Sequence, residues 1–218
     1  MTDADGGVSP ARPWLRVGAM TVAALLLVGF GLLAGQKLLP AESSDPLTTS
    51  AEAGFARDMQ THHLQAVDMS MIILEKSDNQ AIRTLAYDIA TAQGQQAGQM
   101  FAWLTMWNLP QASQEPAMTW MMDADDHDSH GTSDSDSITA MTMPGLATYD
   151  QMEAFRASTT DADSMFLELM IAHHAGGVDM AEGLLERSTN DVVTSLADRM
   201  VAVQVSEINY MNELLAAL

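Results

Sequence analysis

An internal repeat is the feature of this sequence that most constrains its fold. When the chain is shifted by 111 residues, its two halves align without a gap. The aligned pairs include Phe55 and Phe166, Met59 and Met170, His62 and His173, His63 and His174, Met69 and Met180, Leu85 and Leu196, Gln93 and Gln204, and Met100 and Met211. A repeat of this length predicts two copies of one supersecondary unit that pack against each other.

Each copy has the apolar periodicity of two long helices. Apolar residues recur every three or four positions over roughly 51–76 and 79–107, and again over roughly 161–187 and 190–217. A shorter helix is expected at "YDQMEAF". Neither helical hairpin could bury its apolar face alone. The predicted fold class is therefore all-α, a four-helix bundle built from two duplicated helical hairpins that a long crossover loop joins.

A long apolar segment near the N-terminus predicts attachment to a membrane. Residues 17–35, "VGAMTVAALLLVGFGLLAG", carry no charge and can just span a hydrocarbon core of about 30 Å. Arginines precede the segment, so the residues before it are expected to stay in the cytoplasm. We predict an uncleaved transmembrane anchor, with a cleaved signal peptide as the alternative. Both export the remaining chain, and the anchor predicts a single-pass protein of the cell membrane with its C-terminal domain on the extracytoplasmic side.

These patterns divide the chain into six predicted segments. The crossover between the hairpins contains three prolines and the acidic run "DADDHDSHGTSDSDS", which sets it apart from the helical regions. The segments are a short cytoplasmic N-terminus at 1–16, the transmembrane anchor or signal peptide at 17–39, a polar tether at 40–50, the first helical hairpin at 51–107, an acidic crossover loop rich in Met and His at 108–148, and the second helical hairpin at 149–218.

The composition argues against several classes of function. The chain has 29 acidic and 9 basic residues, and a net charge of -20 would repel the phosphates of nucleic acids. It has no cysteine, which excludes disulfides, thiolate metal sites and cysteine nucleophiles. A Gly-rich phosphate loop, a Gly-x-Ser-x-Gly elbow and a His-Glu-x-x-His motif are all absent. No catalytic residue is therefore predicted.

The duplicated histidine pairs are the main candidate site. On a helical wheel, His62 and His63 diverge by about 100°, and both lie on the arc that faces the core. Asp68 lies on the opposite face. A single buried histidine is more often a neutral, hydrogen-bonded core residue than a metal ligand. Four histidines at duplicated positions, flanked by methionines, instead favour metal ligation. The predicted ligands in the helices are His62, His63, His173, His174, Met59, Met69, Met170 and Met180.

Copper is the metal that these residue types favour. Imidazole and thioether donors together suit copper, whereas iron or manganese would call for a set rich in carboxylates. Because the chain contains 18 methionines and no thiol, soft sulfur donors are supplied by thioethers alone. The divergence of His62 and His63 implies that ligands from different helices complete each site.

The partner helices of the two hairpins add polar residues to the predicted core. Gln96 and Glu207 are expected nearer the centre of the inward arc than Gln93 and Gln204. A buried Glu207 carboxylate needs a partner, and an imidazole across the bundle could serve, so Glu207 joins the candidate metal residues. A polar network that fixes helix register is the alternative. The Glu-x-x-His pattern of di-iron bundles is absent, which argues against di-iron oxidase chemistry.

The crossover loop is a second candidate site. His127 and His130 lie among aspartates, with methionines on both sides, and Met143 follows in "MTMPG". Mixed His, Met and Asp side chains suit the capture of copper in either oxidation state. The alternative is a disordered acidic segment in which the histidines are incidental.

The sequence also resembles a known family. "MFLELMIAHHAGGVDMAEGLL", followed by a helix that carries Gln204, Glu207 and Met211, is similar to the bacterial domain-of-unknown-function family 305. The resemblance covers roughly residues 50–218. It implies an exported, ferritin-like four-helix bundle, with a role in copper binding and copper tolerance in some members. It also implies that the four helical histidines are metal-associated, and with them Met59, Met69, Met170, Met180 and Met143. Where members often carry glutamate, this chain has Gln96.

The predicted function is therefore copper binding for buffering, tolerance or delivery, on the outer side of a membrane. The alternative is a structural or accessory subunit of a membrane protein complex, with the histidines in hydrogen-bonded packing. Expected partners are the membrane itself and, in addition, other subunits of a membrane complex or copper-dependent proteins, but no nucleic acid. Formation of a homo-oligomer is left open.

Overall fold

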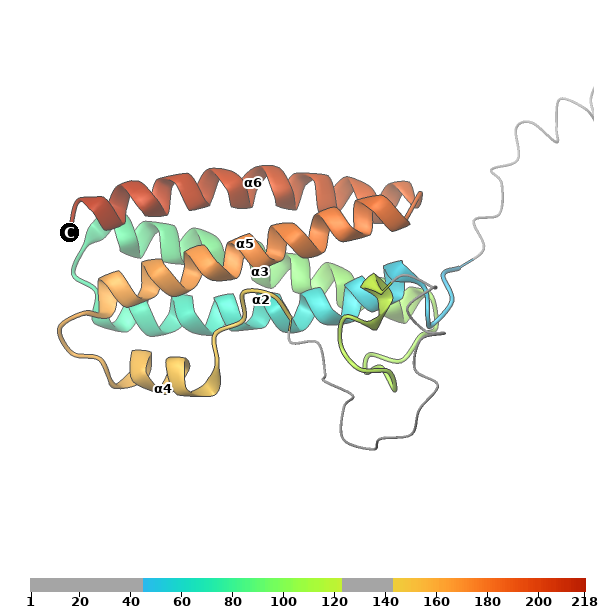
Figure 1. Ribbon diagram of the computed structural model, residues 1–218, viewed down its shortest axis with the longest axis horizontal. Coiled ribbons are helices and arrows are strands. Elements are labelled where there is room, and N and C mark those ends of the chain that lie inside the picture. The colour runs from blue at the N-terminus through green and yellow to red at the C-terminus, as the bar shows by residue number, and fades with distance from the viewer. Residues whose placement is uncertain (1–44, 123–142) are drawn as a thin grey trace, which may run out of the picture. The chain divides into compact units, whose positions relative to one another are not determined.

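The computed structural model describes residues 45–122 and 143–218, which are shown in Figure 1. The chain divides into two units, Met1–Ser44 and Asp45–Leu218, and all the described residues belong to the second. The predicted segments at 1–16 and 17–39 and most of the tether lie outside the described residues. So do His127 and His130 of the crossover loop.

Within the described ranges the protein is entirely helical, which confirms the all-α class. The elements are α2 (Ala51–Lys76), α3 (Gln80–Met106), the 3-10 turn η1 (Thr119–Met121), α4 (Tyr149–Ala157), α5 (Ala162–Arg187) and α6 (Asp191–Ala216). No strand occurs among these residues. None of their helices combines the length and the apolar character needed to cross a membrane.

The two hairpins close through the same turn, because the repeat preserves its residues. In the first turn, the Asn79 amide donates to Ser77 Oγ at 3.1 Å, and Asn79 Oδ1 accepts from the amide of Ala81 at 3.0 Å. In the second turn, the Asn190 amide donates to Ser188 Oγ, also at 3.1 Å, and Asn190 caps the next helix in the same way. These N-caps start α3 and α6 immediately after α2 and α5 end. Each pair of helices is therefore antiparallel.

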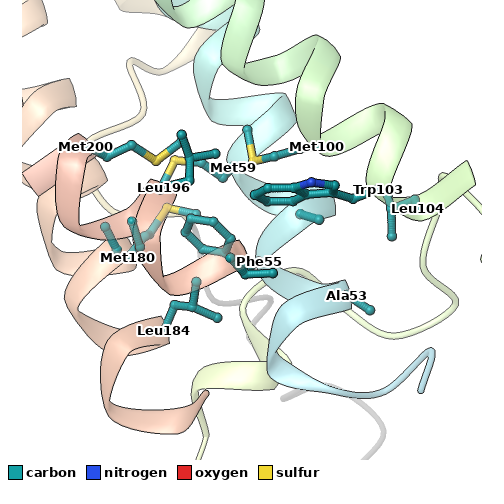
Figure 2. Close-up of a cluster of buried hydrophobic side chains, with 14 of the residues drawn as sticks. Ala53, Phe55, Met59, Met100, Trp103, Leu104, Met180, Leu184, Leu196 and Met200 are labelled. Atoms are coloured by element: carbon teal, nitrogen blue, oxygen red, sulfur yellow. The ribbon is translucent and has the colours of Figure 1, made fainter. Parts of the chain in front are cut away.

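The hairpins meet mainly through α2 and α5, and their core consists of two apolar clusters. The histidines separate these clusters along the helices, since Phe55 and Met59 precede the first pair on α2, and Met69 and Ile73 follow it. Cluster A contains Phe55, Met59, Met100, Leu104, Met180, Leu184, Leu196 and Met200 (Figure 2). Cluster B contains Phe166, Met170, Met211, Met69, Ile73, Leu85 and Ile89. The repeat maps cluster A onto cluster B, so a pseudo-twofold axis passes through the histidine layer.

Replacement of the Asn190 cap should destabilise the second hairpin. In Asn190→Ala the first turn of α6 loses its side-chain acceptor, and we expect the free energy of unfolding to fall by about 1 kcal/mol. The matched control is Asn209→Ala, at an exposed position inside the same helix, where no cap is lost. Urea unfolding followed by circular dichroism measures both variants. Equal stabilities of the two variants would contradict the assigned role of the turn.

Candidate metal-binding site

Four histidines form one layer in the middle of the protein, and none of them is exposed to solvent. His62 of α2 and His173 of α5 face each other at the pseudo-twofold axis. Their ring centroids lie 3.8 Å apart, and the rings are inclined by 36°. His63 and His174 lie farther out, with centroids 6.5 Å from His62 and 6.2 Å from His173 respectively. The layer therefore has an inner pair and an outer pair.

The outer histidines are each held by a side chain from the second helix of their own hairpin. His63 Nε2 lies 2.7 Å from Gln96 Oε1, and His174 Nε2 lies 2.7 Å from Glu207 Oε2. Both partners are only partly buried, and the Glu207 side chain is 20% exposed. Glu207 thus has an imidazole partner, His174, but this partner lies on the other helix of the same hairpin and not across the bundle as expected. Gln96 and Glu207 occupy equivalent positions in the repeat, so the geometry is conserved between the hairpins while the charge is not.

The inner histidines are held by backbone carbonyl groups. His173 Nε2 donates to the carbonyl oxygen of His62 at 2.9 Å, and His62 Nε2 donates to that of Pro144 at 3.1 Å. Exact twofold symmetry would have paired His62 with the carbonyl of His173. The end of the crossover loop replaces that partner, so the site is asymmetric at its centre as well.

Two kinds of contact hold the end of the crossover loop, around Pro144, in place. The loop packs closely against α5, and a side chain of α2 bonds to its backbone. A Cβ atom on Gly176 would lie 2.0 Å from the Pro144 oxygen, so only glycine allows the chain to approach α5 here. Gly145 adopts a φ of 75°, which also favours glycine. On the other side, the Gln65 amide both donates to and accepts from the backbone of Ala147, each at 2.8 Å. These contacts place the Pro144 carbonyl beside His62.

The hydrogen bonds determine which ring nitrogen of each histidine carries the proton. Carbonyl and carboxylate oxygens only accept hydrogen bonds, as does the amide oxygen of Gln96, so every Nε2 must be the protonated donor. Each neutral ring then has its lone pair on Nδ1. All four Nδ1 atoms are buried, and none has a hydrogen-bond partner among the described residues. A buried acceptor without a partner typically costs about 1–3 kcal/mol. The layer therefore contains four imidazole nitrogens with unused lone pairs, and such nitrogens are common metal ligands.

Burial keeps the rings of His62, His63 and His173 neutral. Removal from water lowers the pKa of His63 to about 3 and that of His62 to about 4. The pKa of His173 falls well below its usual value, because of burial and of the neighbouring imidazoles. Neutral imidazole is the form that coordinates metals, so at neutral pH no proton competes for the Nδ1 atoms of His62, His63 and His173.

The predicted methionine ligands flank the histidine layer. Met59, Met69, Met170 and Met180 are all fully buried. Met59 and Met180 belong to cluster A, whereas Met69 and Met170 belong to cluster B, so each cluster combines one methionine from α2 and one from α5. Met143 is partly buried against cluster A. Residues 45–122 and 143–218 contain no group of three or more His, Asp or Glu side chains placed to hold a metal ion.

Two expectations about neighbouring residues have different outcomes. Asp68 points to the surface, as predicted, and forms an ion pair with Arg156. The expected ranking of the polar residues on the partner helices is wrong. Gln93 and Gln204 are buried, at 4% and 3% exposure, whereas Gln96 and Glu207 are only partly buried. Gln96 and Glu207 nevertheless contact the outer histidines through their side-chain oxygens.

Sequence reasoning missed two features of the site. One is the Pro144 carbonyl, because a backbone acceptor leaves no side-chain signature. The adjacent glycines Gly145 and Gly176 were the only available signal. The other is the pair of methionines on the second helices, Met100 of α3 and Met200 of α6, which lie in cluster A but were not among the predicted ligands. Figure 2 shows Met59, Met180 and Met200, from three different helices, pointing into the same space.

The fold and the layer define an all-helical protein of duplicated hairpins with buried histidines, and the comparisons with known proteins identify its family. The family model for the domain of unknown function DUF305 matches residues 52–215. The chain belongs to the DUF305 family. The comparison with functionally curated proteins found no match.

Several solved structures share this fold. A DUF305 protein of Streptomyces coelicolor, classed as secreted, is 44% identical, with a TM-score of 0.68 over 78% of this chain and 95% of its own. A DUF305 fragment from Deinococcus radiodurans is 30% identical, with a TM-score of 0.60 over 77% and 97%. CopM in its Cu(I)-bound form is 21% identical, with a TM-score of 0.56 over 77% and 96%. At that identity the likeness to CopM shows the fold alone.

Acid should destabilise the metal-free protein through the buried histidines His62, His63 and His173. Their pKa is lower in the folded state than the value of about 6.5 of an unfolded chain, so protons bind the unfolded state preferentially. Stability is therefore complete above pH 6.5 and falls as the pH drops toward 4. Each such histidine contributes up to about 1.4 kcal/mol per pH unit in that window. Urea unfolding at several pH values should show a shallower decline for His63→Gln than for the wild type. Parallel declines would contradict the assigned state of His63.

Proposed function

We propose that this protein binds copper, as Cu(I), through imidazole Nδ1 atoms and methionine sulfurs in the histidine layer. The observation that carries the proposal is the set of four buried Nδ1 lone pairs, none of which has a hydrogen-bond partner among the described residues. A bound cation would satisfy these donors, whereas protonation is opposed by burial. The Nε2 hydrogen bonds orient the rings and fix the tautomer, as outer-sphere partners of metal-binding histidines commonly do.

The donor set favours Cu(I) over harder cations. Iron, manganese, calcium and magnesium prefer several carboxylate oxygens, and the only carboxylate that contacts a histidine of this layer in the described residues is Glu207. Thioether sulfur and neutral imidazole suit a soft monovalent ion, and Cu(I) accepts low coordination numbers. Fully buried methionines adjoin the layer on both sides. When bound, copper would contribute its affinity for these soft donors, and the chain would exclude water from it.

The family relationship supports the proposal. CopM has this fold and has been crystallised in Cu(I)-bound, Cu(II)-bound and Ag-bound forms. We place the domain outside the cytoplasm, as a ferritin-like four-helix bundle that residues 17–39 attach to the membrane. Its role there would be buffering, tolerance or delivery of copper, with copper-dependent proteins or subunits of a membrane complex as recipients. The acidic surface would raise the local concentration of cations.

Competition for Cu(I) tests the proposal. The full-length chain, purified in detergent, is titrated against a chromophoric Cu(I) chelator under reducing conditions, and the bound metal is counted by native mass spectrometry. The double variant His63→Gln/His174→Gln removes both outer donors. Its affinity should fall by more than the roughly 10–100-fold that loss of an outer-sphere partner typically costs.

Two control variants locate the binding. Met71→Leu/Met106→Leu replaces exposed thioethers, and its affinity should match that of the wild type. His127→Ala/His130→Ala measures the contribution of the crossover loop. If the double variant of the outer histidines binds Cu(I) as tightly as the wild type, the histidine layer is not the copper site. If the wild type binds no copper, the alternative of a structural subunit of a membrane complex is favoured.

A further inference from the structure

The two outer histidines differ in the charge of their partners, and this difference bears on which copper ions the layer can hold. Gln96 and Glu207 hold their histidines at the same distance, 2.7 Å, and are both separated from them by 33 residues. One partner is a neutral amide, and the other is a carboxylate. Near-identical geometry with unequal charge means that the difference is electrostatic and does not arise from a change in packing.

Each outer histidine lies beside a different apolar cluster, which defines two half-sites. The first half-site comprises His63, Gln96 and Met59. Met59 lies one helical turn before His63, and histidine side chains on a helix lean toward the preceding turn. Both Met59 and Met100, one turn beyond Gln96, belong to cluster A. The second half-site comprises the equivalent residues His174, Glu207 and Met170, and it adjoins cluster B in the same way.

The two clusters also differ in their methionine content. Cluster A, beside the half-site without a carboxylate, has more methionine sulfur than cluster B. Met200 of cluster A corresponds in the repeat to Ile89 of cluster B, and both are buried with 1% exposure. Met143 packs against cluster A only. The neutral first half-site is therefore richer in thioether sulfur, whereas the second half-site has the carboxylate.

Charge decides which ions can be buried in each place. The cost of transferring an ion from water into a medium of low dielectric rises with the square of its charge, so a divalent ion needs a compensating anion far more than a monovalent one. A carboxylate that accepts a hydrogen bond from a metal-binding imidazole also makes the ring a stronger donor. The Glu207 carboxylate supplies both effects through His174. Gln96 supplies neither.

We propose that the two half-sites hold copper of different charge: the first is restricted to Cu(I), and the second also accepts Cu(II). This inference rests on the proposed function and extends it, because it assigns an ion class to each half of the layer. Glu207 acts in it as a positioning residue that works through His174. The ability of one domain to retain copper in both oxidation states then depends on the carboxylate of Glu207, which stands where the first hairpin has Gln96.

Reciprocal exchange of the two partners tests this inference. All proteins are full length, in detergent, and carry His127→Ala/His130→Ala so that the loop histidines do not contribute. Each is loaded with Cu(II), passed over a weak chelator, and examined by metal counting and by electron paramagnetic resonance for nitrogen couplings. The wild type should retain one Cu(II) with imidazole nitrogen couplings. Glu207→Gln should lose it, and Gln96→Glu should retain a second one.

Matched measurements separate the possible outcomes. Glu213→Gln removes one exposed carboxylate from the same helix and should behave as the wild type. Every variant should still bind Ag(I), a monovalent probe that is not redox-active, and this retained binding shows that the layer is intact. Retention of Cu(II) by Glu207→Gln, or failure of Gln96→Glu to hold a second ion, would overturn the inference. Failure of the wild type to bind Ag(I) and copper of either charge would instead overturn the proposed function.

Discussion

The structure depends on how each buried imidazole uses its two nitrogens. In all four histidines Nε2 donates a hydrogen bond to an oxygen atom. The acceptors are the side chains of Gln96 and Glu207 and the backbone carbonyl groups of Pro144 and His62. That arrangement leaves the lone pair on Nδ1, to which no described residue donates a hydrogen bond. A layer assembled only for packing would be expected to satisfy both nitrogens, because an unsatisfied buried acceptor destabilises the fold. The arrangement instead preserves donors at the expense of stability, which is characteristic of a binding site.

Duplication of the hairpin explains how four histidines come to lie in one layer. Differences between the two copies explain why the histidines have unequal surroundings. The repeat brings two histidine pairs to one axis and places a methionine-containing cluster on either side. Symmetry then fails at three places: Pro144 replaces one carbonyl partner, Gln96 stands opposite Glu207, and Met200 stands opposite Ile89. Each of these changes alters a hydrogen-bond partner, a charge or a sulfur atom close to the layer. The same helical framework thus holds two histidine pairs in different electrostatic surroundings.

Much of the fold could be predicted from the sequence, because periodicity and repetition are local signals. The four long helices begin and end within two residues of their predicted ranges. The inward direction of His62 and His63 followed from helical geometry. What could not be predicted were contacts made across the fold by backbone groups, such as that of Pro144 with His62. The relative burial of Gln93 and Gln96 also depends on how closely neighbouring helices approach, which a helical wheel does not contain.

The most direct test of this account is a nitrogen NMR measurement on the histidine rings of the metal-free protein at neutral pH. The account predicts four neutral rings with the proton on Nε2, and a shift of Nδ1 resonances when Ag(I) is added. Rings protonated on Nδ1, or Ag(I)-dependent shifts confined to Nε2, would contradict it, because the lone pairs that are proposed to bind the metal would then not be free.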